Sequence, residues 1–97
     1  MDYRYERNEI GLYDEIGQRL ARVEFPEIGA QTVEVTHTIV DPSLQGQGIA
    51  GKLMEALVFS LRQSERKAEL SCSYAVRWFA AHPEAADVLK GENSDVT

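Results

Sequence analysis

Residues 40–50 read Val40-Asp41-Pro42-Ser43-Leu44-Gln45-Gly46-Gln47-Gly48-Ile49-Ala50 and stand between an alternating, strand-like pattern and a helical one. Three small residues in this loop, Gly46, Gly48 and Ala50, allow the main chain to come close to a ligand. A helix that begins here points unsatisfied N–H groups and the positive end of its dipole at the same place. The pattern is therefore typical of a strand–loop–helix site for an anion such as a pyrophosphate.

Two established phosphate-binding patterns do not fit this loop. The Walker loop needs Lys and then Ser or Thr directly after its last glycine, whereas Leu53 follows Lys52 here. The dinucleotide pattern GxGxxG is matched by letters alone, because the chain of 97 residues is too short for two mononucleotide-binding halves. What remains is a QxxGxA pattern, formed by Gln45, Gly48 and Ala50.

The chain before the loop predicts strands. Apolar residues alternate or cluster over 10–13, 19–25 and 32–40, and turn-forming residues separate these segments at 14–17 and 26–29. Three antiparallel strands in a meander are the simplest arrangement. In the last strand, one face is expected to carry Val33, Val35, His37 and Ile39.

The chain after the loop predicts a β–helix–β unit. A helix is expected over 45–64 and a strand over 67–72, so the strands on either side of the helix should be parallel with a right-handed crossover. Ser73 is placed to cap a short helix, and Pro83 fits the first turn of another. The predicted stripe of the long helix that faces the sheet contains Ile49, Leu53, Ala56, Leu57, Ser60 and Leu61.

These patterns predict one α/β (α+β) domain over 1–97. Its sheet is mixed and mostly antiparallel, with one parallel β-helix-β crossover and a long helix packed on it. A polar tail at about 90–97 is expected to be flexible. No apolar run approaches the roughly 20 residues of a membrane span, and the charged start of the chain is unlike a signal peptide, so we expect a cytoplasmic protein that binds no membrane.

Charge and cysteine content narrow the function classes. The net charge of −6 argues against a nucleic-acid partner, since binding phosphates needs a basic surface. An acidic surface attracts a cationic amine substrate, and it also keeps a protein soluble. The single cysteine, Cys72, forms no internal disulfide and excludes a Cys-rich metal site, and we expect no metal.

The loop and its surroundings resemble the acetyl-CoA-binding motif of the GNAT superfamily of N-acetyltransferases. The superfamily pattern is (Q/R)xxGx(G/A) after a strand that ends in hydrophobic-x-Pro, which matches residues 39–42 and 45–50 here. The likeness covers roughly residues 10–89. Further segments are similar to a small, C-terminally short GNAT-like subfamily, namely His37-Thr38, Leu70-Ser71-Cys72-Ser73-Tyr74, Trp78-Phe79 and His82-Pro83-Glu84.

The resemblance implies an acetyl-CoA-dependent N-acetyltransferase that acts on an amine or thiol acceptor. It implies that backbone N–H groups of the loop hold the CoA pyrophosphate, and that the pantetheine arm pairs like an extra strand with the preceding main chain. The residues expected to bind coenzyme A are Ile39, Val40, Gln45, Gly46, Gln47, Gly48, Ile49 and Ala50.

Three residues are catalytic candidates. Cys72 falls at the end of the second parallel strand, and the resemblance implies an active-site residue there. Its role is that of an acyl-accepting nucleophile or of a residue that lines the acetyl pocket, and the alternative is a small buried side chain. His37 is either a core histidine or a general base. Tyr74 can protonate the departing CoA thiolate, although larger GNAT enzymes supply their tyrosine from a C-terminal region missing here.

The short chain also shapes the expected partners. The acceptor is an amine of a small molecule or a protein, and its side of the site is left open or is completed by a second subunit, so we expect a monomer or a weak homodimer. A different class of function, a non-enzymatic acyl-CoA-binding module or sensor, fits the same loop. A third interpretation, a pure interaction domain, predicts no CoA binding at all.

Overall fold

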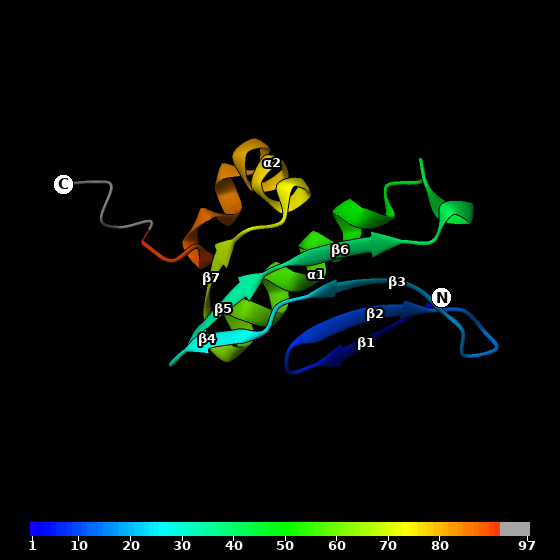
Figure 1. Cartoon of the computed structure of the whole chain (residues 1–97), viewed down its shortest axis with the longest axis horizontal. Coiled ribbons are helices and arrows are strands. Elements are labelled where there is room, and N and C mark those ends of the chain that lie inside the picture. Colours follow the sequence, from blue (N-terminus) through cyan, green and yellow to red (C-terminus); the bar gives the residue numbers. More distant parts are fainter. Residues whose placement is uncertain (92–97) are drawn as a thin grey trace.

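The computed structural model describes residues 1–91 and contains two sheets, which lie side by side, and two α-helices (Figure 1). The elements in chain order are β1 (Asp2–Glu6), β2 (Glu9–Tyr13), β3 (Arg19–Glu24), β4 (Glu27–Gly29), β5 (Thr32–Val35), β6 (His37–Val40), the short 3-10 helix η1 (Pro42–Leu44), α1 (Ile49–Ser64), β7 (Lys67–Leu70), α2 (Ser73–Ala81) and the 3-10 helix η2 (Pro83–Val88).

The strands form a four-stranded sheet of order β1-β2-β3-β6 and a three-stranded sheet of order β4-β5-β7. All neighbours are antiparallel except β5 and β7, which are parallel and connected through α1. The predicted fold class, a mostly antiparallel sheet with one parallel crossover, is therefore confirmed. Sequence analysis missed β1, and it predicted a turn at 26–29 where the short strand β4 lies.

The two sheets diverge at Thr36, the residue between β5 and β6 (Figure 1). The Thr36 N–H donates to the Glu24 carbonyl at 3.0 Å, which joins the chain to β3. On the other side, the N–H groups of Ser71 and Cys72 both donate to the Val35 carbonyl, at 3.1 and 3.0 Å. Before Thr36 the strand pairs with β7, and after it the strand pairs with β3, so β6 ends the four-stranded sheet.

The change of partner also reverses which side chains are buried. Val33 and Val35 have no exposed surface, but His37 is exposed and Ile39 is 40% exposed. Thr38 and Val40 are half-buried in their place. The prediction that these four residues share one face was therefore wrong beyond Thr36, and with it the interpretation of His37 as a core histidine. The alternation of apolar and polar residues cannot by itself predict where a strand passes from one sheet to another.

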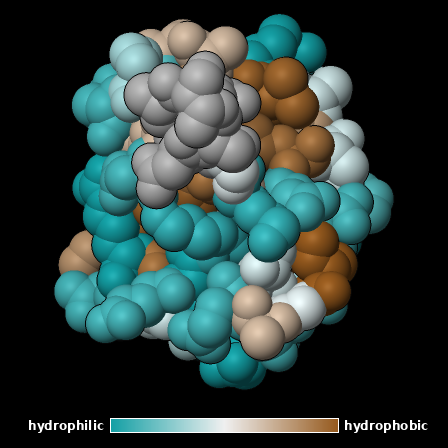
Figure 2. Space-filling view, turned by 90° about the vertical axis from the view of Figure 1, so that its left-hand side faces the viewer, coloured by the Kyte–Doolittle hydropathy of each residue, from teal (hydrophilic) through white to brown (hydrophobic). Residues whose placement is uncertain are grey.

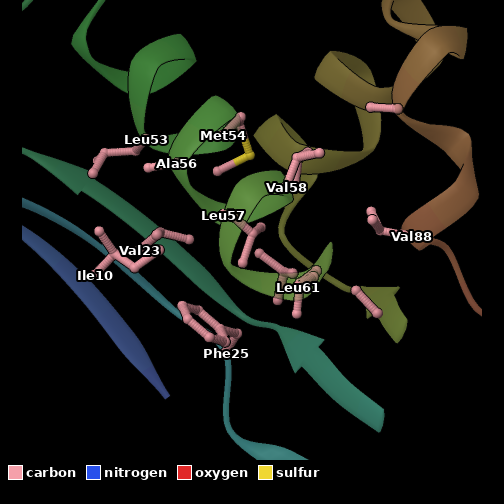
Figure 3. Packing of buried hydrophobic residues seen from close by; sticks show 14 of the residues in the cluster. Ile10, Val23, Phe25, Leu53, Met54, Ala56, Leu57, Val58, Leu61 and Val88 are labelled. Carbon is pink, nitrogen blue, oxygen red and sulfur yellow. The ribbon is translucent and has the colours of Figure 1, made fainter. Parts of the chain in front are cut away.

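The core lies between the four-stranded sheet and α1. Side chains of Ile10, Val23 and Phe25 point from the strands toward the helix, which meets them with a row of leucines (Figure 3). The predicted apolar stripe is confirmed except for Ser60, which is half-buried. Residues Met54 and Val58 are buried as well, because α2 and η2 cover a second side of α1.

Helix α1 begins at Ile49, four residues later than predicted, and ends at Ser64 as predicted. Gly48 precedes it with a φ of 76°, in the left-handed region, and this backbone conformation ends the preceding loop. At the other end Glu65 has a φ of 57°, and its N–H donates to the Arg62 and Leu61 carbonyls. The residues before Ile49 are therefore loop and not helix.

The C-terminal part folds back against β7 and α1. Cys72, and not the predicted Ser73, stands at the N-terminal cap of α2, where its carbonyl accepts the Val76 N–H at 3.0 Å. Pro83 begins η2 as expected. The Lys90 N–H donates to the Ala68 carbonyl at 2.9 Å, so the chain is held through residue 90; the rest of the predicted tail, from residue 92, lies outside the described residues.

The end of the molecule that carries β4 and the C-terminal segment is covered mostly by hydrophilic side chains, with apolar residues gathered on one side (Figure 2). This agrees with the net charge of −6. Within residues 1–91 neither helix combines the length and the apolar character that a membrane crossing requires.

Candidate active site

A cavity of about 380 Å³ opens between the loop after β6, the first turn of α1 and the start of α2. Most of the residues predicted to bind a ligand line it, but Ile39 and Gln47 do not. The Gln47 side chain instead turns back toward the Ser43 carbonyl, 3.5 Å away. The lining consists of Thr38, Val40, Leu44, Gln45, Gly46, Gly48, Ile49, Ala50, Gly51 and Tyr74.

The shape of the loop depends on its glycines. Gly46 and Gly48 have φ angles of 84° and 76°, a region that side chains disfavour. A Cβ added at either position meets no atom within 4 Å, so a side chain there would project into open space at the cavity mouth. Asp41 fixes the turn before them, because its carboxylate accepts the Ser43 N–H at 2.9 Å and the Ser43 hydroxyl at 2.7 Å. These bonds lower the pKa of Asp41.

The N-terminus of α1 faces this cavity with unpaired backbone donors. The first bond inside the helix runs from the Lys52 N–H to the Gly48 carbonyl, at 3.2 Å. The N–H groups of Ile49, Ala50 and Gly51 come before it, and no side chain caps this end of the helix. Together with the helix dipole they favour a negatively charged group at this end of α1, as expected for the predicted anion site.

The open edge of β6 supplies another set of backbone groups. The Asp41 N–H donates to the Leu20 carbonyl at 2.8 Å, and Ile39 is paired with Arg22 in the same register. Because backbone direction alternates along an antiparallel strand, Ile39 bonds toward β3 while Thr38 and Val40 point away from it. Of the two predicted main-chain positions on this strand, Val40 therefore has its backbone groups at the open edge, as Thr38 does, whereas Ile39 does not.

Cys72 lies beside this edge, at the point where the two sheets separate. Its sulfur is 3.5 Å from the Thr38 Oγ1, and Thr38 lines the cavity. Partial burial of the sulfur acts to raise the pKa of Cys72, but hydrogen bonds from the Thr38 hydroxyl and from the Ala75, Tyr74 and Thr38 N–H groups outweigh it. The pKa of the thiol is therefore lowered, which favours the reactive thiolate.

Tyr74, from the first turn of α2, lines the cavity near the helix α1. Its hydroxyl is 3.6 Å from the position that a Cβ at Gly51 would take. Burial raises the pKa of Tyr74; Arg77 acts against this, and the nearby Cys72 adds to it. The phenol is consequently protonated at neutral pH and can donate a proton.

His37 lies apart from these groups. It sits on the face of β6 opposite to Thr38, its side chain is 64% exposed, and its Nδ1 is 3.4 Å from a Glu24 carboxylate oxygen. It lines a different, shallow depression that is rich in carboxylates. Tyr74 therefore lines the first cavity, and Cys72 contacts its lining residue Thr38 without lining the cavity itself, whereas His37 lies elsewhere.

Sequence analysis missed Thr38, Leu44 and Gly51 as lining residues. Thr38 could have been found only by locating the change of strand partner at Thr36, which moves every later residue of the strand to the other face. Gly51 could have been predicted from the motif, because it stands directly after Ala50, the last residue of the QxxGxA pattern.

Comparisons with known proteins agree on one family. The sequence model of the GCN5-related N-acetyl-transferases matches residues 7–88. A solved structure of a GCN5-like protein from Staphylococcus aureus is 26% identical, with a TM-score of 0.73, and the match covers 91% of this chain and 86% of that one. No curated protein matches the chain.

Two larger enzymes share the fold. The ribosomal-protein-S18-alanine N-acetyltransferase of Escherichia coli is 21% identical, with a TM-score of 0.62 over 80% of this chain and 53% of that one. The IAA acetyltransferase of Bacillus cereus is 19% identical, with a TM-score of 0.59 over 75% of this chain and 51% of that one. The match thus spans about half the length of these two proteins.

Proposed function

This chain belongs to the GCN5-related N-acetyltransferase family, and we propose that it transfers the acetyl group of acetyl-CoA to an amine through Cys72. Family and fold are those of an acyltransferase. The observation that carries the finer proposal is the composition of one cavity. It joins the uncapped N-terminus of α1 to the open edge of β6, and Cys72 lies at that edge.

The cavity has the groups that coenzyme A requires. The N–H groups of Ile49, Ala50 and Gly51 and the glycine loop before them are suited to a pyrophosphate. The Thr38 and Val40 main chain, which points away from β3, can pair with the amides of an extended pantetheine arm. In this arrangement the loop holds the pyrophosphate of acetyl-CoA, and the thioester of acetyl-CoA lies toward the point where the two sheets separate.

The proposed reaction has two steps. In the first, the Cys72 thiolate attacks the thioester carbonyl carbon, the bond from that carbon to the CoA sulfur breaks, and Tyr74 gives its phenolic proton to the departing sulfur. A backbone N–H near Val40, at the open edge, donates to the carbonyl oxygen as negative charge develops there. Acetyl-Cys72 and a Tyr74 phenolate remain.

In the second step the acceptor amine attacks the acetyl carbon on Cys72. The bond from that carbon to the Cys72 sulfur breaks, the thiolate is regenerated, and the proton lost by the amine returns to the Tyr74 phenolate. The net reaction converts acetyl-CoA and an amine into an acetylamide and free CoA. Hydrogen bonds that stabilise the Cys72 thiolate favour its release in this step.

The acceptor is proposed to be an amine of a small molecule or of a protein. In the Escherichia coli relative the acceptor is named as an alanine of ribosomal protein S18. An acceptor that arrives as an ammonium on the other face of β6 would meet His37 and Glu24, where the imidazole can take up the first proton and leave the neutral amine that attacks in the second step. We further propose that the single domain works in the cytoplasm, as a monomer or weak homodimer without nucleic acid, where reducing conditions keep Cys72 free.

Mass spectrometry of the protein mixed with acetyl-CoA tests the function. The proposal predicts an acetyl group on Cys72, a burst of free CoA and turnover with members of an amine panel, all lost in Cys72→Ala. Turnover that survives in Cys72→Ala would mean direct attack by the amine. CoA binding without any turnover would mean a non-enzymatic module, and calorimetry that detects no CoA binding would mean an interaction domain.

A further inference from the structure

The Thr38 hydroxyl is the polar side chain that reaches Cys72 across the fork between the two sheets. Thr38 belongs to β6 in the four-stranded sheet, and Cys72 follows β7 in the other one. Their side-chain atoms are 3.5 Å apart, although the residues are 34 positions apart in sequence. The contact therefore depends on the divergence of the strands at Thr36 and is set by the tertiary fold.

The residues around Thr38 offer its hydroxyl few other hydrogen-bond partners. The residue opposite Thr38 on β3 is Val23, which is fully buried and offers no polar atom. Such a pair has no backbone bonds between its members, so the two side chains lie close together. The neighbouring hydroxyl of Thr36 is engaged elsewhere, since it donates to the Glu24 carbonyl at 3.4 Å. Thr38 is thus held with its hydroxyl toward the sulfur.

We propose that Thr38 is a positioning residue whose hydroxyl donates to the Cys72 thiolate and holds it beside the cavity that Thr38 lines. The inference rests on the proposed role of Cys72 as the acetyl carrier. A thiolate has no proton to give, so Thr38 must be the donor when the sulfur is charged. A hydrogen bond to a charged acceptor is stronger than one to a neutral thiol, so the contact favours the ionised form.

The other groups around the sulfur do not replace this donor. The backbone N–H groups of Tyr74 and Ala75, at the start of α2, and of Thr38 itself also approach the sulfur, and a change of side chain at Thr38 leaves them in place. Among the titratable side chains, Tyr74 interacts electrostatically with Cys72. Arg77, on the same helix, interacts with Tyr74 in turn. On β6 the nearest titratable group, His37, lies on the opposite face, with its Nδ1 3.4 Å from a Glu24 carboxylate oxygen. Removal of the Thr38 hydroxyl should therefore show as a change in Cys72 alone.

Alkylation by iodoacetamide as a function of pH tests the proposal, because Cys72 is the single thiol in the chain. Thr38→Val should move the pH profile to higher pH and slow alkylation at pH 7 by about five- to tenfold, with an unchanged limiting rate at high pH. Thr38→Ser should restore most of the rate. Thr36→Val, which removes the adjacent hydroxyl that points elsewhere, should behave like the wild type.

Two results would overturn the role of Thr38. The first is a Thr38→Val profile that coincides with the wild type, and the second is an equal slowing in Thr36→Val. The limiting rate at high pH shows whether the sulfur of each variant is still accessible in a folded chain. Alkylation needs no acetyl-CoA, so this test stands even if no acetyl transfer is found, and acetyl transfer that is insensitive to Thr38→Val would reject Thr38 while leaving the proposed function intact.

Discussion

The strands β5 and β6 continue one another along the chain, yet they have opposite structural roles. β5 is paired on both sides, with β4 and β7, and its valines have no exposed surface. β6 is paired on one side only, with β3, and none of its residues is buried. β5, the closed half of this extended segment, therefore contributes to the core. β6, its open half, has one edge that pairs with no other strand within residues 1–91, and the single residue Thr36 lies between the two halves.

This difference explains why the candidate site lies where it does. An unpaired strand edge presents N–H and C=O groups that an extended ligand can use, whereas a strand paired on both sides presents none. The uncapped start of α1 and the sulfur of Cys72 both lie beside the unpaired half. Each prediction below changes one half and uses a matched position in the other, or elsewhere in the chain, as the control.

The largest expected effect comes from a charge in the closed half. Val35→Asp places a carboxylate in a fully buried position without a partner, so we expect it to lower the free energy of unfolding by more than about 4 kcal/mol and to abolish folding. Ile39→Asp, four residues further along the same alternating pattern, should change it by less than about 1 kcal/mol. Urea unfolding followed by circular dichroism measures both, and equal losses would restore the single-face interpretation.

A side chain in the loop should block ligand binding without unfolding the protein. Gly48→Glu puts a carboxylate at the cavity mouth and strains a left-handed residue, so we expect the affinity for CoA to fall by about a hundredfold or more. Gly17→Glu strains a turn residue with a φ of 90° at a remote position, and it should leave the affinity unchanged. Calorimetry with CoA that gave the same value for both variants would show that the loop is not the anion site.

Prolines can test the direction of the β6 main chain. Val40→Pro removes an N–H that points away from β3, so we expect a loss of about five- to tenfold in CoA affinity with little loss of stability. Ile39→Pro removes an N–H that bonds to β3, and it should mainly destabilise the fold. Affinity and thermal unfolding measured together on both variants check the assignment, which fails if the two prolines exchange these effects.

The smallest effect concerns acid stability. The hydrogen bond from Arg22 lowers the pKa of Glu24, against the opposing effect of burial, and the charges of Arg22, His37 and Arg19 lower it further. Because the folded pKa is below the ordinary 4.5, the contribution of Glu24 is present above that pH and is lost as the pH falls through the folded value. In acid unfolding, Glu24→Gln should remove less than about 1 kcal/mol of pH-dependent stability. The control is Glu69→Gln, which alters an exposed carboxylate on β7 that forms no ion pair within residues 1–91. This control should remove none of that stability. A larger loss from Glu69→Gln would contradict this.

Much of the fold could be predicted because its signals are local. The apolar spacing of α1, the alternation of β3 and the parallel relation of β5 and β7 all follow from short-range patterns. β1 escaped prediction although Tyr3 and Tyr5 alternate with charged residues in Asp2–Glu6, because this pattern is only two tyrosines long and all five residues of the strand are exposed.

The details of the site depend on contacts that are distant in sequence. The side chains of His37 and Thr38 lie on the faces opposite to those predicted, because the strand pairs with β7 before Thr36 and with β3 after it. Nothing in the sequence marks that change of partner. The start of α1 at Ile49 follows from the left-handed backbone of Gly48, which a glycine permits but does not require. Cys72 became a candidate through its place after a predicted strand and through the family resemblance, and Tyr74 through the resemblance, while the contact from Thr38 to Cys72 needed the fold.

The central claim is that the open half of the strand, and not the closed half, receives acetyl-CoA. Amide NMR of the labelled protein during titration with CoA tests it most directly. The account predicts that the N–H signals of Thr38 and Val40 and of residues 48–51 shift, while those of Val33 and Val35 stay in place. Saturable shifts in β4, β5 and β7 with none along β6 or the loop would contradict it.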